Sequence, residues 1–142
     1  MILCDVGVLL QAMVAKAAHH ELCRRELEGL RSRPREMAVN ELILAAVVRI
    51  GTNPRLFQPC PTVEEVFAFV DALRSPAEVR RLAPGPRHWT IFKDLILATG
   101  IRGSDTTDAY LAALAIEHGC EWWTTDQGFS RFPGLRWRNL IA

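Results

Sequence analysis

The chain has 142 residues, of which 49% are hydrophobic and 23% charged; this balance excludes a disordered chain and allows a sizeable core. Its formal net charge of +1 excludes the broad basic field that non-specific nucleic-acid binding would need. Because no apolar run reaches membrane-spanning length and the four cysteines are scattered, we expect one reduced, cytoplasmic domain over residues 1–142 that makes no membrane contact.

The first fifty residues alternate short apolar runs with helical patterns. An apolar run at residues 1–4 ends on Asp5 and predicts a buried strand, which a helix follows at once. Residues 19–30 repeat apolar positions at helical spacing and predict an amphipathic helix. A brief strand at residues 37–39 then leads into an apolar helix over residues 41–50.

The remainder of the chain is divided by capping and turn signals. Thr62 and Glu65 have the spacing of a capping box and open a further helix. A short strand over residues 79–82 and a helix over residues 89–100 follow. The last forty residues predict, in order, a helix at 105–118, a strand at 121–125 and a strand at 135–140. This alternation is typical of an α/β domain with a central, mainly parallel sheet.

Four acids occupy the ends of predicted elements. Asp5 and Asp126 each follow a strand, and Glu41 and Asp108 each lie at a helix start. Ligands of open parallel sheets bind beyond the carboxyl ends of the strands, and the helices that follow strands begin at the same edge. We therefore expect the four carboxylates to share one pocket.

Clustered carboxylates repel one another by roughly 4 kcal/mol for a pair about 4 Å apart at an effective dielectric constant of about 20. A cation would cancel this repulsion, and hard oxygen ligands without His or Cys favour Mg²⁺ or Mn²⁺. The chemistry natural to such a site is metal-assisted hydrolysis of a phosphodiester bond.

Each acid also has an ordinary structural interpretation. Asp5 and Asp126 could be turn residues, and Glu41 and Asp108 could simply favour the positive ends of their helices. Asp105 is interpreted as a helix cap rather than a ligand. The side chains of three further residues are interpreted as structural: His118 at a helix end, and Trp122 and Trp123 in the core.

At this point the sequence resembles a PIN domain of the VapC-type ribonuclease toxins found in bacterial toxin–antitoxin pairs. Three segments carry the resemblance and together span the chain: ILCDVGVLL, NELILAAVVRIGTNPRLF and TTDAYLAALAIEHGCEWWTTDQGFSRFPGLRW. The resemblance implies a three-layer α/β sandwich and an Mg²⁺- or Mn²⁺-dependent endoribonuclease centre. It also implies a homodimer, and inhibition by a small VapB-like antitoxin that inserts a C-terminal segment into the active site.

Carried over residue by residue, the resemblance makes four acids the catalytic metal ligands: Asp5, Glu41, Asp108 and Asp126. Thr125 matches a hydroxyl residue that orients the last acid or a bound water. The sequence departs from the family at two positions. Gly7 stands where the family often has Asn, and Gly128 stands where it often has an acid. Both changes remove polar groups, chiefly around a second metal ion. Two alternatives to an RNA-cleaving toxin remain open: a binding module with weakened catalysis, and a metal-dependent nuclease acting on DNA.

Overall fold

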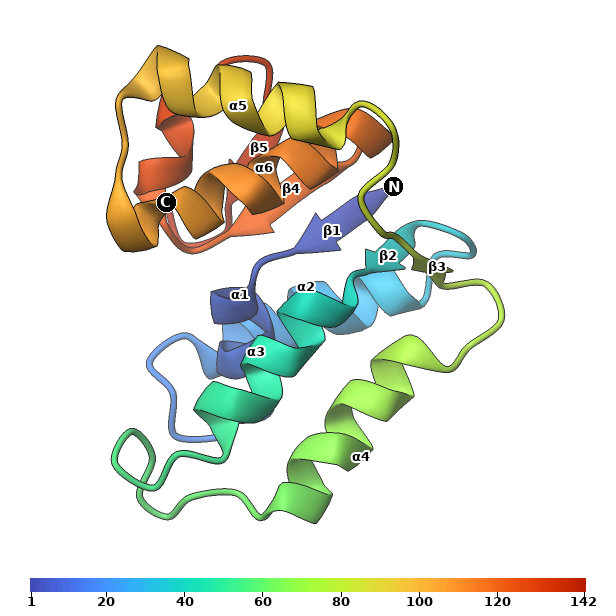
Figure 1. Ribbon diagram of the computed structural model, residues 1–142. Coiled ribbons are helices and arrows are strands. Elements are labelled where there is room, and N and C mark those ends of the chain that lie inside the picture. The colour runs from blue at the N-terminus through green and yellow to red at the C-terminus, as the bar shows by residue number, and fades with distance from the viewer.

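The computed structural model describes all residues, 1–142, as a five-stranded parallel sheet between two layers of helices (Figure 1). The strands are β1 (Ile2–Cys4), β2 (Met37–Val39), β3 (Arg80–Arg81), β4 (Glu121–Thr124) and β5 (Trp137–Asn139). The helices are α1 (Val6–Met13), α2 (His20–Arg31), α3 (Glu41–Gly51), α4 (Val63–Arg74), α5 (His88–Thr99) and α6 (Thr106–His118), with short 3₁₀ turns η1 (Gly103–Asp105) and η2 (Gln127–Arg131). The five expected strands and the three-layer α/β sandwich are confirmed.

The strand order is β3-β2-β1-β4-β5, and every neighbouring pair is parallel. From the central strand β1 the chain first builds outward through β2 and β3, then returns to place β4 and β5 on the other side. The topological switch point therefore lies between β1 and β4, where open parallel sheets form their ligand crevice. In Figure 1, α5 and α6 cover one face of the sheet, and α1 to α4 lie on the other side.

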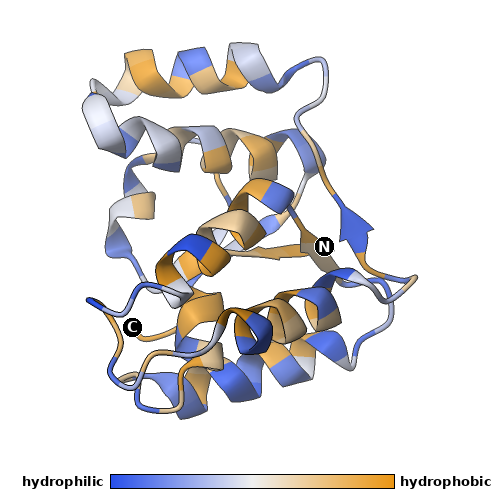
Figure 2. Ribbon diagram, turned by 60° about the horizontal axis from the view of Figure 1, so that its bottom comes forward, coloured by the Kyte–Doolittle hydropathy of each residue, from blue (hydrophilic) through white to orange (hydrophobic).

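The sheet is buried along its central strands and polar at one edge. All residues of β1 and β2 are buried, whereas Arg80 and Arg81 make the edge strand β3 hydrophilic and exposed (Figure 2). A charged two-residue edge discourages pairing with another chain. Trp122 and Trp123 are 0% and 2% exposed, which confirms their interpretation as core residues. None of the helices combines the length and apolar character needed to cross a membrane.

Local capping explains where several helices begin and end. The Asn40 side chain accepts hydrogen bonds from the backbone N–H groups of Leu42 and Ile43, and so caps α3. Thr62 caps α4 by accepting from the Glu65 N–H, so one half of the expected capping box is present. The interpretation of Asp105 as a cap is wrong, because its side chain makes no capping bond and η1 leads directly into α6.

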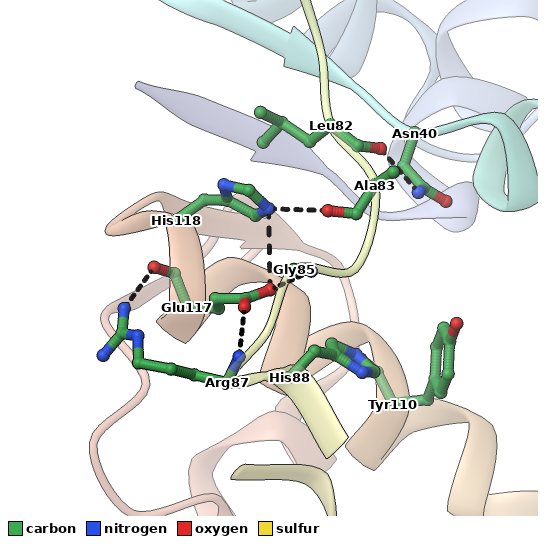
Figure 3. Close-up of polar contacts among 9 residues, drawn as sticks. All are labelled: Asn40, Leu82, Ala83, Gly85, Arg87, His88, Tyr110, Glu117 and His118. Carbon is green, nitrogen blue, oxygen red and sulfur yellow. Dashed lines mark hydrogen bonds and ion pairs between the residues drawn. The ribbon is translucent and has the colours of Figure 1, made fainter. Parts of the chain in front are cut away.

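The connection from β3 to α5 is held by polar contacts at the end of α6 (Figure 3). Glu117 accepts the backbone N–H groups of Gly85 at 2.7 Å and Arg87 at 2.9 Å. Nε2 of His118 lies 2.8 Å from the carbonyl oxygen of Ala83, so this His contacts the connection rather than its own helix end. Burial raises the pKa of Glu117, but the two backbone donors and the nearby histidines outweigh it and hold this pKa below its usual range.

The Glu117 contacts yield a prediction about stability. A carboxyl whose pKa is lowered by folding stabilises the protein fully above its ordinary pKa, and the contribution is lost as the pH falls through the lowered value. Glu117→Gln leaves one of two N–H donors facing an amide NH₂, so we expect it to lower the free energy of unfolding by about 1–3 kcal/mol at pH 7. Urea unfolding at pH 7 and pH 3 measures this, and the deficit should shrink at pH 3. The exposed Glu78→Gln is the control; an equal deficit in both variants, or one independent of pH, would contradict the account.

Candidate metal and nuclease site

The carboxyl ends of β1 and β4 are joined by one buried hydroxyl. Asp5 follows β1 and Thr124 ends β4, and the two strands are hydrogen-bonded neighbours. The Thr124 hydroxyl donates to Oδ2 of Asp5 at 2.7 Å and accepts the backbone N–H of Asp126 at 3.0 Å. Oδ1 of Asp5 accepts the N–H of Val6 at 2.7 Å, so Asp5 also begins α1. Asp5 can therefore cap α1 and also belong to the site.

Asp126 and Asp108 approach the same position from two other elements. Asp126 begins η2, and its Oδ1 accepts the N–H of Gly128 at 2.8 Å. Asp108 lies in the first turn of α6, and its Oδ2 accepts from Nη2 of Arg131 at 3.1 Å. Three aspartates from separate parts of the sequence therefore face the switch point predicted from the strand order.

The three aspartates lie close enough for their charges to affect one another. Burial chiefly raises the pKa of Asp5 to about 6; hydrogen bonds from Thr124 and Val6 oppose this rise, and the charges of Asp108 and Asp126 add to it. The pKa of Asp108 is also raised, mainly by burial, with Arg131 lowering it and the charges of Asp126 and Asp105 raising it. The positive charges of the protein therefore do not fully balance the negative charge of these aspartates.

Glu41 does not lie with the three aspartates. Its carboxylate is exposed and forms an ion pair with Arg74 of α4, with Oε2 3.2 Å from Nη2. Both residues line a groove of about 400 Å³ between α3 and α4. The cleft that contains Asp5 and Asp108 is a separate one, and α3 contributes Ala45 and Arg49 to its lining. The role of Glu41 as a metal ligand stays a prediction, and it requires the carboxylate to leave Arg74.

The hydroxyl that contacts the aspartate segments is that of Thr124, and a role for Thr125 toward a bound water stays a prediction. Thr124 is fully buried and makes both bonds described above, whereas Thr125 makes no side-chain hydrogen bond. Instead, Oγ1 of Thr125 approaches Gly7 so closely that a Cβ added there would lie 3.1 Å from it. A side chain at position 7 would therefore require the Thr125 hydroxyl to shift by a few tenths of an ångström.

Two arginines near the aspartates could not be assigned from the sequence. Arg131 pairs with Asp108, and Arg49 lines the cleft of about 340 Å³ that contains Asp5 and Asp108. The sequence alone does not separate these two from the other arginines of the chain. Arg131 lies five residues after Asp126, in the last of the segments that carry the family resemblance.

The donor chemistry of the pocket fits a hard divalent cation. The three carboxylates supply oxygen donors alone, and their mutual repulsion would fall if a cation bound between them. Both oxygens of Asp5, Oδ2 of Asp108 and Oδ1 of Asp126 accept from protein donors, whereas Oδ1 of Asp108 and Oδ2 of Asp126 accept from none. No three acidic, His or Cys side chains of the chain are close enough to form a shell around one ion, so binding one ion with all three aspartates would require their side chains to move closer together.

A parallel α/β sandwich with three aspartates at its switch point defines an acidic, hydrolase-like crevice, and the comparisons with known proteins specify the family. The PIN domain family model matches residues 2–135. The chain is 37% identical to the VapC ribonuclease Mb2897 of Mycobacterium bovis over 141 residues, covering 99% of this chain and 96% of the relative. It is 34% identical to ribonuclease VapC25 of Mycobacterium tuberculosis over 137 residues, covering 96% of each. The chain belongs to the PIN-domain family, within its group of VapC ribonucleases.

Solved structures agree on the fold. Mycobacterium tuberculosis VapC20, described as a sarcin-ricin loop cleaving toxin, superimposes with a TM-score of 0.68 at 18% identity, covering 96% of this chain and 99% of that one. VapBC2 from Rickettsia felis, bound to a DNA fragment from its promoter, has a TM-score of 0.68 at 17% identity, covering 97% and 98%. At these identities the likeness concerns the fold alone. PIN-domain VapC nucleases generally depend on a divalent metal ion.

The raised pKa of Asp5 yields a prediction for the metal-free protein. Because folding raises this pKa to about 6, Asp5 contributes to stability at low pH, and this contribution is lost as the pH rises from about 4 through 6. Asp5→Asn does not titrate, so its stability relative to wild type should rise over this window by roughly 1–3 kcal/mol. Chemical unfolding in EDTA at pH 4.5 and pH 7.5 measures the change. The exposed Asp94→Asn should show none, and a difference for Asp5→Asn that is the same at both pH values would contradict the assignment.

Proposed function

We propose that this protein is the toxin of a toxin–antitoxin pair and that it hydrolyses phosphodiester bonds of RNA at a divalent metal site, with Mg²⁺ or Mn²⁺ as the ion. The observation that carries the proposal is the placement of Asp5, Asp108 and Asp126 within range of one another's charges beside the β1/β4 switch point. The ribonuclease names of relatives that match nearly the whole chain support RNA as the substrate. We further propose that it acts in the cytoplasm.

In this proposal the three aspartates hold the ion, and Thr124 keeps two of them in place. When bound, a divalent ion can activate a water molecule and stabilise the negative charge that develops on the phosphate. Thr124 fixes the orientation of Asp5 through its hydroxyl and fixes the backbone of Asp126 through the same oxygen. Asp108 reaches the pocket from the start of α6, where the helix dipole favours a carboxylate. Arg49 lines the adjoining cleft and supplies a planar donor group suited to a phosphate.

Removing any one of these aspartates should abolish cleavage. We expect Asp5→Asn, Asp108→Asn and Asp126→Asn each to reduce Mg²⁺-dependent cleavage of total RNA by about 100-fold or more, since each removes a charged ligand worth several kcal/mol of charge stabilisation. The measurement is the initial cleavage rate by gel, with EDTA as the metal-free control and Asp94→Asn as the matched variant. Equal cleavage by wild type and Asp126→Asn would refute the site. Cleavage of single-stranded DNA in place of RNA would favour the DNA nuclease, and no metal-dependent cleavage by wild type would favour the binding module.

A pair of variants tests whether Glu41 is a fourth ligand. If Glu41 leaves Arg74 to bind the metal, Glu41→Gln lowers RNA cleavage, whereas Arg74→Gln, which frees the same carboxylate, leaves cleavage equal or higher. If Glu41 only pairs with Arg74, the two variants lose the same ion pair and should behave alike. Initial rates across a Mg²⁺ titration distinguish the two cases.

We also propose that the protein forms a homodimer and binds a small VapB-like antitoxin. Complexes named as VapBC pairs among the structural neighbours support the antitoxin. The groove between α3 and α4, lined by Leu44, Val48 and Phe67 and ending at the Glu41–Arg74 ion pair, is an apolar surface suited to it. For the dimer, α5 exposes Trp89 and Leu97, which are 69% and 71% exposed.

The dimer proposal predicts the effect of a charge on α5. Leu97→Glu should convert a dimer into a monomer, because an unpaired carboxylate would be buried at the interface. Light scattering coupled to size-exclusion chromatography gives the mass directly. The matched control is Leu56→Glu, at a leucine that is 58% exposed and lies outside α5, and this variant should remain dimeric. A monomeric wild type, or a dimeric Leu97→Glu, would reject this surface.

A further inference from the structure

We infer that Arg131 is the resident cation of the aspartate pocket: it competes with the divalent metal for Asp108, and when metal binds it is released to bind an RNA phosphate. This inference rests on the proposed function. The contact that carries it is the ion pair between Nη2 of Arg131 and Oδ2 of Asp108, at 3.1 Å. The guanidinium takes one lone pair of this carboxylate and places a positive charge where the metal ion would lie, so the two cations compete for Asp108.

When Arg131 moves away, the negative charge of the aspartates is sufficient to attract a divalent ion. Arg131 pairs with Asp108 alone, and Asp126 and Asp105 are negative charges close enough to affect Asp108. Arg131 therefore offsets only part of the negative charge. A divalent ion is the stronger counter-charge, and its arrival would place Arg131 next to a like charge.

The position of Arg131 allows its side chain to move while its backbone stays fixed. Arg131 ends η2, whose neighbours Phe129 and Phe132 are 1% and 3% exposed in the core. The guanidinium lies 5.1 Å from the centre of the Phe132 ring and is about one-third exposed, so it borders solvent. It makes one hydrogen bond, to Asp108, and the remaining N–H donors are available. A planar fork with free donors beside the aspartates suits the two non-bridging oxygens of a phosphate.

Arg131 also shares its turn with a proposed ligand. Asp126 caps η2 and Arg131 ends it, so residues 126–131 supply both the carboxylate and the cation. Any RNA phosphate that approaches the ion beside Asp126 would come within reach of the arginine at the other end of the same turn. The unpaired Arg49 would flank the phosphate from α3, across the cleft.

The test measures metal affinity and cleavage separately. Isothermal titration of Mn²⁺ into metal-free protein gives the dissociation constant, and we expect Arg131→Gln to bind Mn²⁺ about fivefold tighter or more because a competing positive charge has been removed. Arg131→Lys, which keeps the charge, should remain within about twofold of wild type. At saturating Mn²⁺, the rate of total-RNA cleavage should move the opposite way and fall in Arg131→Gln.

The matched control is Arg138→Gln. Arg138 also forms a 3.1 Å ion pair, with Glu26, and its guanidinium also lies 5.1 Å from an aromatic ring, that of Trp123, but it faces α2 and not the aspartates. Its Mn²⁺ affinity and RNA cleavage should equal those of wild type. Mn²⁺ affinity that is unchanged or weaker in Arg131→Gln overturns the inference, as does cleavage that rises at saturating Mn²⁺. A wild type that binds no Mn²⁺ overturns the proposed metal site itself, so the two failures are distinct.

Discussion

The Thr124 hydroxyl is the interaction on which the geometry of this site depends. It donates its proton to Asp5 and accepts the N–H of Asp126, so a single buried oxygen fixes the ends of two neighbouring parallel strands relative to each other. Without this hydroxyl, the half-buried carboxylate of Asp5 would lose one hydrogen-bond donor, and the N–H of Asp126 after β4 would lose its acceptor. The strand order determines where the crevice lies, and this hydroxyl determines how the ends of β1 and β4 are aligned beside it.

The same pocket holds more negative charge than the protein compensates. Burial and the mutual repulsion of Asp5, Asp108 and Asp126 raise the pKa values of the first two, while Arg131 relieves part of the strain at Asp108. Such a cluster costs stability in the metal-free chain and becomes favourable when a divalent ion binds. In the proposed metal site, function and stability would therefore oppose each other, beside a core that buries the central strands and much of α6.

The sequence predicted the fold well because its signals are strong and local. Apolar runs of three to four residues, helix-ending glycines and capping side chains locate the strands and most helix boundaries. The strand-end rule, which needs only the topology, predicted one pocket for all four acids; Thr124 links the strand ends that carry Asp5 and Asp126, and the charge of Asp126 reaches Asp108. The rule could not predict which way a helix-start acid points. Glu41 lies at the correct edge of the sheet, yet its place in the first turn of α3 directs its carboxylate to Arg74 on α4.

The sequence also could not predict which side chains contact one another. Thr124 and Thr125 are adjacent and identical in type, and only the pleat of β4 decides that Thr124 faces Asp5. Asp105 precedes a helix as a cap should, but a 3₁₀ turn leads into α6 and leaves no capping geometry. The ion pair of Arg131 with Asp108 spans 23 positions in the chain, and no local pattern reports a contact of that range.

The central claim is that three aspartates gather around one divalent ion. Anomalous diffraction from crystals grown with Mn²⁺ tests it most directly, because the signal locates the metal without reference to activity. The account predicts one peak bounded by the carboxylates of Asp5, Asp108 and Asp126, with the Arg131 side chain turned away from Asp108. The absence of a peak there at saturating Mn²⁺, or a peak elsewhere on the chain alone, would contradict it.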